Sequence, residues 1–131
     1  MEKTSMGRAL FTSTTDLIGK MQRNYRIRKN GQFQYVYRKG KGVSTPRMAL
    51  TYIRAGRLQV GFSVSKKVGN AVVRNRTKRR MRECFRLRIP RLVKGFYIFS
   101  ARPPAAKSSY QELELDMDRL LTRMKLFRET Q

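Results

Sequence analysis

The chain has 131 residues, of which 31 are Lys or Arg and 8 are Asp or Glu, so its formal net charge at pH 7 is +23. This length suits one domain with a modest core. The charge predicts a polyanionic partner, because Lys and Arg stay protonated at physiological pH and there is no His to titrate. With no His and a single Cys, the usual zinc ligand sets and the Ser-His and Cys-His nucleophiles are excluded.

The first 24 residues mix Thr and Ser with scattered charge and show no sustained hydrophobic period. We therefore expect residues 1–24 to be a poorly ordered extension, followed by a domain over residues 25–131. The one cysteine, Cys84, cannot form an intrachain disulfide, which suits a reducing compartment, and we expect the protein to be cytoplasmic. No apolar run approaches the roughly 20 residues of a membrane span, so no membrane association is expected.

A short helix is predicted over residues 31–39, with Asn30 as its N-cap and Gly40 ending it in a left-handed conformation. Phe33 and Tyr37 share one face of this helix at a spacing of four. That face is either core or the wall of a groove on which unstacked bases could stack. Periodicity alone favours the core, because an apolar helical stripe is more often buried than binding.

Two strands are predicted next, after a mobile linker at residues 40–42. Residues 47–54 and 58–64 both alternate in hydrophobicity, and Ala55-Gly56 between them is typical of a tight turn, so we expect a two-stranded hairpin. The second strand has one apolar face and one small polar face that carries Gly61. A ligand could approach this polar face closely.

Residues 63–88 contain the strongest signal in the chain, a turn capped by Asn70 and then a very basic helix. Its N-terminus, beside two lysines, would suit a phosphate. Between residues 66 and 91 there are eleven Lys or Arg and one acid, Glu83, so like charges repel and a partner must supply negative charge. The apolar arc is too narrow for a membrane surface, which favours nucleic acid. The arc consists of Val73, Thr77, Met81, Cys84 and Phe85, and the opposite side carries Arg74, Asn75, Lys78, Arg79, Arg82 and Arg86.

The end of the chain is predicted to be structural. Pro90 ends the basic helix region, and residues 96–100 form a short apolar strand of the kind that is buried on both faces. Ser109 and Glu112 form a capping box for a last helix. Apolar residues then recur at core spacing, at Leu113, Met117, Leu120, Leu121, Met124 and Phe127.

The acids are too few and too scattered for a self-contained metal nuclease, since Glu83 is the only one between Asp16 and Glu112. We therefore expect neither a catalytic residue nor a metal site in the protein itself. Basic composition leaves open an RNA-binding structural protein, a DNA-packaging protein and a subunit of a ribonucleoprotein enzyme. The run Arg74-Asn75-Arg76 favours folded RNA, because Arg binds phosphates bidentately and Asn can both donate and accept at a sugar or base edge.

Residues 62–83, FSVSKKVGNAVVRNRTKRRMRE, closely resemble the signature of the bacterial ribonuclease P protein subunit. The resemblance includes NGQFQYVYRKG at residues 30–40 and GFYIFSARPPA at residues 95–105. It implies an α+β two-layer sandwich like domain 2 of ribosomal protein S5, with a left-handed βαβ crossover. It also implies a ribonucleoprotein that removes the 5′ leader from precursor tRNA, in which the RNA subunit is the catalyst and Mg²⁺ the required ion. The alternative is a noncatalytic RNA-binding protein of the same fold, such as a ribosomal protein.

The resemblance also assigns site residues by position. The cleft for the single-stranded leader would contain Phe33, Tyr37 and Thr51, although Thr51 stands where the family often has an aromatic residue. Thr77 and Arg80 replace residues that are usually apolar, which is expected to thin the buried side of the basic helix. The residues that would face the catalytic RNA are Lys66, Lys67, Arg74, Asn75, Arg76, Lys78, Arg79 and Arg82.

Overall fold

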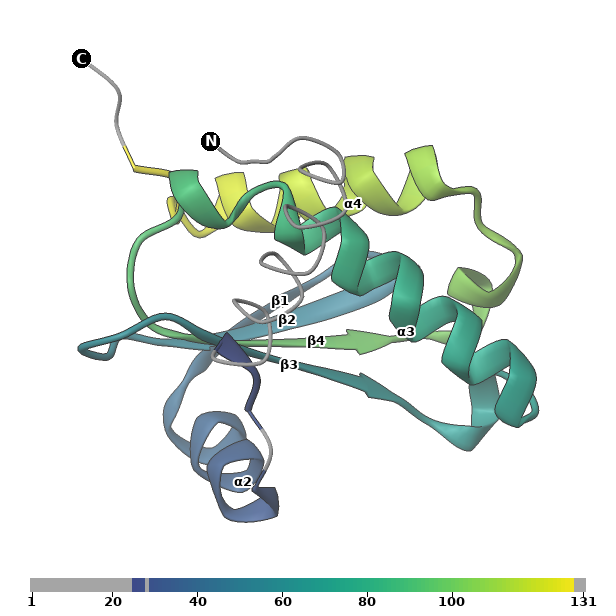
Figure 1. Ribbon diagram of the computed structural model, residues 1–131, viewed down its shortest axis with the longest axis horizontal. Helices are drawn as coiled ribbons and strands as arrows, with labels where there is room; N and C mark the ends of the chain where they lie inside the picture. The colour runs from purple at the N-terminus through teal and green to yellow at the C-terminus, as the bar shows by residue number, and fades with distance from the viewer. Residues whose placement is uncertain (1–24, 28, 129–131) are drawn as a thin grey trace, which may run out of the picture.

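The computed structural model describes residues 25–27 and 29–128 (Figure 1). The prediction about residues 1–24 therefore lies outside the described part of the chain. The described elements, with η marking short 3₁₀ helices, are α2 (Asn30–Lys39), β1 (Lys41–Ser44), β2 (Met48–Ile53), β3 (Gln59–Val64), η1 (Lys66–Val68), α3 (Ala71–Arg86), η2 (Ile89–Arg91), β4 (Phe96–Ala101), η3 (Pro103–Lys107) and α4 (Tyr110–Arg123).

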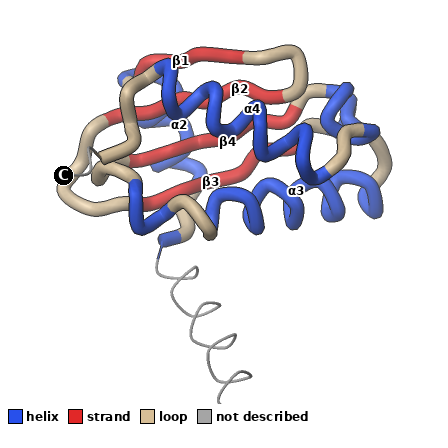
Figure 2. Tube along the Cα trace, turned by 90° about the horizontal axis from the view of Figure 1, so that it is seen from above, coloured by secondary structure: helices blue, strands red, loops and turns tan. Residues whose placement is uncertain are grey.

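The four strands form one mixed sheet in the order β1-β2-β4-β3. β2 is antiparallel to both β1 and β4, whereas β3 is parallel to β4. After β3 the chain runs back through α3, above the sheet, and then enters β4 (Figures 1 and 2). When the sheet is seen with α3 above it and both strands pointing away from the reader, β4 lies to the left of β3. The crossover is therefore left-handed. Parallel crossovers are right-handed in about 98% of cases, so this connection is a distinctive feature of the fold, and it confirms the expected architecture.

The predicted hairpin is wrong. Both of its strands exist, but β4 lies between β2 and β3, so the two are not paired. Hydrophobic alternation and turn residues identify strands without identifying their neighbours. β4 takes the central position because Tyr97, Ile98 and Phe99 are all fully buried and can be covered only when both faces of the strand are packed.

The predicted mobile linker is also wrong, since residues 41 and 42 begin β1, which pairs with β2. Gly40 is extended (φ −84°, ψ 174°), not left-handed. Position 40 requires a glycine because there is no space for a side chain: a Cβ there would lie 2.7 Å from the carbonyl oxygens of Val36 and Tyr52. The N-cap of α2 is Lys29, and Asn30 is already helical.

Helices cover the two faces of the sheet unequally (Figure 1). α3 and α4 lie on one face, over a large core in which Phe85 of α3 contacts the rings of Tyr97 and Phe99 at centroid distances of 5.4 and 5.5 Å. On the opposite face α2 covers a small cluster of Ile27, Val36 and Ile98. The molecule is thus an α+β sandwich whose main layer pair is closed and whose other face is only partly covered.

The buried side of α3 is as predicted. Thr77, Met81, Cys84 and Phe85 are buried and Val73 is half-buried. Thr77 is accommodated in the core because its hydroxyl donates to the Val73 carbonyl at 2.9 Å.

The capping box at the start of α4 is confirmed by bonds in both directions between Ser109 and Glu112. The helix ends at Arg123, so Met124 and Phe127 lie beyond it, and the next fully packed side chain is Leu126.

Candidate RNA-binding surface

The start of α3 is built by a short basic turn. Asn70 caps the helix by accepting a hydrogen bond from the Val73 amide at 3.0 Å, as its sequence position predicts. The residue before it must be glycine, because a Cβ on Gly69 would lie 2.9 Å from the Cβ of Val73. Lys66 and Lys67 are exposed in η1, directly ahead of this turn. The turn therefore presents two ammonium groups next to the helix N-terminus.

The basic residues of α3 fall into two groups. Arg74, Lys78 and Arg82 follow each other at intervals of four, so they form one stripe along the helix, and all three are partly buried. Arg76 lies on the other side of the helix, the side of Arg80, whose guanidinium donates to the Ser108 carbonyl at 3.1 Å. The remaining predicted residues, Lys66, Lys67, Asn75, Arg76 and Arg79, are exposed.

A cavity of about 300 Å³ lies at β3, an edge strand of the sheet. It unites residues that the sequence assigned to two separate sites, because Lys78 and Arg82 come from the helix set and Phe33 comes from the proposed leader cleft. The complete lining is Arg26, Ile27, Phe33, Val60, Gly61, Phe62, Lys78 and Arg82.

Five lining residues were not among the predicted site residues, although Gly61 lies on the strand face that the sequence predicted a ligand could approach: Arg26, Ile27, Val60, Gly61 and Phe62. Arg26 forms a parallel bridge with Val60 on β3, and the next amide, of Ile27, donates to the Val60 carbonyl at 2.8 Å. Gly61 lets the Phe33 ring lie directly on the strand, since a Cβ at this position would be 2.5 Å from Phe33 Cζ. The basic run at residues 25–29 and the small polar face of the second strand were visible signals, but neither indicates which element it meets.

Charge in this cavity is not balanced by the protein. Burial lowers the pKa of Arg82, and the neighbouring charges of Arg26 and Arg79 lower it further. The Nε atoms of Arg74 and Arg82 are buried and have no hydrogen-bond partner among the described residues. Buried donors without partners and like charges close together both cost free energy. An anion placed in the cavity would reduce the repulsion between these like charges.

The leader-cleft residues are not all gathered in one place. Phe33 has two roles, since it packs against the small cluster under α2 and also lines the cavity. Tyr37 lies over the same sheet face, with its hydroxyl 3.0 Å from Ser100 Oγ of β4. Thr51 is paired with Ile98, which belongs to that face. Neither Tyr37 nor Thr51 lines the cavity itself.

The other polar groups have structural partners. Asp116 is buried and accepts from Thr45 and Arg47, and Arg88 binds Asp118 at 2.5 Å. Burial raises the pKa of Cys84 to about 11, so its thiol stays protonated. Residues 25–27 and 29–128 contain no group of three or more His, Cys, Asp or Glu that could hold a metal ion. Over the same residues, no helix is long and apolar enough to cross a membrane.

Comparison with known proteins identifies relatives over most of the chain. A family model described as Ribonuclease P matches residues 21–125. The Ribonuclease P protein component of Alkaliphilus metalliredigens is 40% identical over 110 residues, covering 81% of this chain and 98% of that protein. The corresponding protein of Exiguobacterium sp. is 38% identical over 109 residues, covering 82% and 96%. The solved structure of the Staphylococcus aureus RNase P protein superposes with a TM-score of 0.74 at 34% identity, covering 79% of this chain and 98% of that one.

These matches do not favour the alternative of a ribosomal protein with the same fold. They agree with the fold and with the basic helix. The chain belongs to the ribonuclease P protein family and is the accessory protein subunit of that endoribonuclease, with an RNA subunit as its partner.

Proposed function

We propose that the cavity at β3 receives the single-stranded 5′ leader of precursor tRNA. The observation that carries this proposal is the placement of the Phe33 ring in the same cavity as Lys78 and Arg82. An aromatic ring offers a surface on which an unstacked base can stack, and the two cations can bind the phosphates on either side of it. Tyr37 and Thr51 would extend this path across the open face of the sheet.

The exposed basic residues of η1 and α3 would bind the RNA subunit. They point to solvent on the outer side of the helix, where only a partner can neutralise them. Arg74 and Arg82 are partly buried cations, so they would gain most from a charge-assisted contact with a phosphate. This surface consists of Lys66, Lys67, Arg74, Asn75, Arg76 and Arg79, and Lys78 and Arg82 are shared with the leader cavity.

The chemistry of cleavage would be carried out by the RNA subunit with Mg²⁺. The contribution of this protein is electrostatic: Lys and Arg beside crowded phosphates reduce their mutual repulsion, so the RNA folds and binds its substrate at a lower Mg²⁺ concentration. A cytoplasmic location agrees with this role and with a buried, unreactive Cys84 thiol.

The direct test compares cleavage of a precursor tRNA by the RNA subunit with and without this protein, as Mg²⁺ is lowered. We expect the protein to raise both the rate and the affinity for precursor tRNA, with the largest gain at low Mg²⁺ and low salt. Equal rates and equal affinities across the Mg²⁺ series would refute the proposal. Cleavage by the protein alone, free of RNA, would also refute it.

The leader path can be tested with two exposed tyrosines of α2. Tyr37 is 41% exposed and bonds to the sheet, whereas Tyr35 is 42% exposed and is not bonded to the sheet. Stacking is worth about 1–3 kcal/mol per base, so Tyr37→Ala should reduce the preference for leader-bearing over mature tRNA by roughly fivefold or more. Tyr35→Ala removes the same side chain outside the path and should leave that preference unchanged. Equal effects of the two changes would remove Tyr37 from the leader path.

A further inference from the structure

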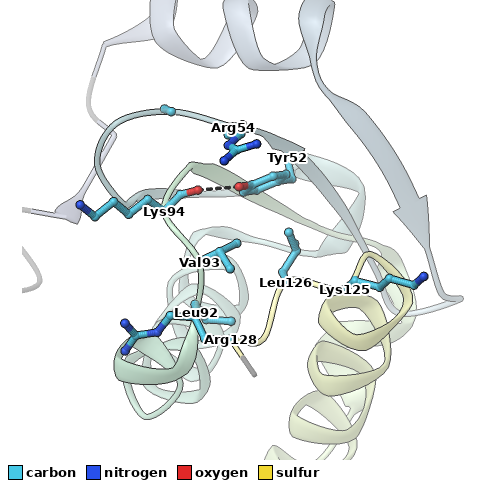
Figure 3. A pocket seen from close by; sticks show the side chains of 9 residues that line it. Tyr52, Arg54, Leu92, Val93, Lys94, Lys125, Leu126 and Arg128 are labelled. Atoms are coloured by element: carbon cyan, nitrogen blue, oxygen red, sulfur yellow. Dashed lines mark hydrogen bonds between the residues drawn. The ribbon is translucent and has the colours of Figure 1, made fainter. Parts of the chain in front are cut away.

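A second cavity, of about 580 Å³, lies at the opposite end of the molecule from the start of α3 (Figures 1 and 3). Three separate segments form it: the turn after β2, the segment before β4 and the chain that follows α4. Four basic side chains line it, Arg54, Lys94, Lys125 and Arg128, and no carboxylate is among its described lining residues. All four are exposed.

The wall of this cavity is apolar and rigid. Figure 3 shows Leu92, Val93 and Leu126 in its middle, with the charged ends of Lys94, Lys125 and Arg128 at its periphery. The segments on either side are tied together, because the Val93 amide donates to the Leu126 carbonyl at 2.9 Å. The Tyr52 hydroxyl donates to the Lys94 carbonyl at 2.5 Å, which fixes the ring in the wall. An apolar wall with a cationic rim concentrates positive potential over the cavity.

The cations here differ from the structural arginines of the same protein. Arg47 and Arg88 each bind carboxylates of α4. No ion pair between described residues involves Arg54, Lys94, Lys125 or Arg128, although the Arg128 guanidinium donates a hydrogen bond to the Pro90 carbonyl. Four cations around one hollow repel each other unless an anion is present. Because they stand apart around the rim, they suit a chain of phosphates better than one small anion.

Lys125, one of the four cations, also has an unusual backbone conformation. Among the described residues it is the one non-glycine residue with positive φ, 58°. It follows the C-cap of α4 in a Schellman motif, in which the Leu126 amide donates to the Leu121 carbonyl and the Lys125 amide to that of Thr122, both at 3.0 Å. Glycine is favoured at this position, and a lysine there is strained. Strained residues that persist in a structure concentrate at functional sites.

We propose that this cavity is a second RNA-contact site, which binds the phosphodiester backbone of an RNA strand. It rests on the RNA-binding part of the proposed function, but not on the leader cavity, from which it is separate. The strand belongs either to the RNA subunit or to the precursor tRNA, and both offer the same phosphate chemistry. The apolar wall beside the cations also allows an unstacked base to lie against it.

A matched pair of substitutions in one turn tests the site. Arg54 lines the cavity, whereas Arg57, exposed in the same turn, does not. We expect Arg54→Gln to weaken binding by about fivefold at moderate KCl and to lower the salt slope by about one, and Arg57→Gln to do neither. Two measurements distinguish the source of the strand: affinity of the full chain for the RNA subunit alone, and KM of the assembled holoenzyme for precursor tRNA.

Lys125→Gly adds a readout that general loss of charge would not give. Removing the strain should raise Tm by roughly 4 °C, while the loss of the ammonium weakens RNA binding. The proposal is overturned if Arg54→Gln and Arg57→Gln behave alike in both measurements, or if Lys125→Gly changes stability alone. Arg82→Gln separates the two proposals: if it weakens binding and Arg54→Gln does not, the proposed function stands and this inference falls.

Discussion

The two faces of the sheet are made by the same strands but are completed in different ways. On the face under α3 and α4, the core is closed and its charges are paired within the chain, as Arg47 is with Asp116 and Arg88 with Asp118. On the face under α2, which we call the open side, the hydrophobic cluster is small. At the β3 edge of this side, Arg26 and, from α3, Arg82 line a cavity without a carboxylate among the described residues.

This difference separates charges that are paired within the chain from charges that are not, and we propose that the second group binds a partner. The acids of α4 are used on the closed side, so arginines there have a structural role. The open side carries cations without a carboxylate partner among the described lining residues, together with the Phe33 ring. Substitutions on the closed side should therefore reduce stability, and those on the open side should reduce RNA binding.

The largest effect is expected on the closed side, from Asp116→Ala. Asp116 is 1% exposed, and it accepts a hydrogen bond from Thr45 Oγ1 at 3.0 Å and binds Arg47 at 3.3 Å. Its loss removes the carboxylate acceptor of Thr45 Oγ1 and one of the two carboxylate partners of Arg47, so the free energy of unfolding should fall by about 2 kcal/mol, with Arg47 turning partly to solvent. Urea denaturation measures this. Leu115→Ala, at an exposed position of the same helix, is the control and should cost little.

The opposite result is expected on the open side, from Arg82→Gln. Because burial and two neighbouring arginines already disfavour the charged Arg82 side chain, its replacement should leave the free energy of unfolding within about 0.5 kcal/mol or raise it. Affinity for the RNA subunit should fall about tenfold, as a charge-assisted contact to phosphate is lost. Filter binding across a KCl series measures it. If the free energy of unfolding fell by more than the free energy of RNA binding, the distinction between the two sides would not hold.

A smaller effect is expected from two glycines near α2. Gly61→Ala places a methyl 2.5 Å from Phe33 Cζ, so the ring must move away from the strand. We expect a loss of about 1 kcal/mol in stability and a reduced preference for leader-bearing substrate. Gly31→Ala is the matched control, because nothing lies within 4 Å of its added methyl. In α2 it should stabilise the protein by roughly 0.5–1 kcal/mol and leave substrate preference unchanged.

The smallest effect concerns acid pH. The backbone hydrogen bond from Ser109 lowers the pKa of Glu112, and Arg47 lowers it further. A carboxylate whose folded pKa is depressed stabilises the protein above its unfolded pKa, and this contribution is lost as pH falls from there through the folded value. The urea midpoint should therefore decline below about pH 4.5, and Glu112→Gln should flatten that decline. A decline of the same size in the variant would assign it to other carboxylates.

Local patterns predicted much of the fold. The cap at Asn70, the capping box at Ser109 and the buried arc of α3 depend on residues within four positions of one another, so the sequence alone specifies them. The same is true of the central strand, whose run of buried apolar residues has no alternation. The boundaries and the pairing of the other strands could not be read in this way, because a strand pattern carries no information about its neighbour.

The candidate site shows the same limit. The basic residues of the helix could be named from the sequence, but their division into a stripe facing β3 and an exposed group depends on how α3 packs. Arg26 carries no strong local signal, and it became a lining residue only because the chain before α2 runs along the edge of β3. Gly61 lies on the small polar face that the sequence identified, but only the tertiary structure places the Phe33 ring against it.

By itself the sequence determined the charge, the N-caps and buried faces of α3 and α4, and the type of partner that such a charge requires, since each follows from residue types and short-range periodicity. The tertiary structure decided which strands are neighbours, which cations form ion pairs with a carboxylate and which cations line a cavity. The physical reason is that pairing and burial depend on contacts between residues far apart in the chain. Lys78 and Phe33 are separated by three strands in sequence, yet they line one cavity because a left-handed crossover brings α3 over the edge that α2 underlies.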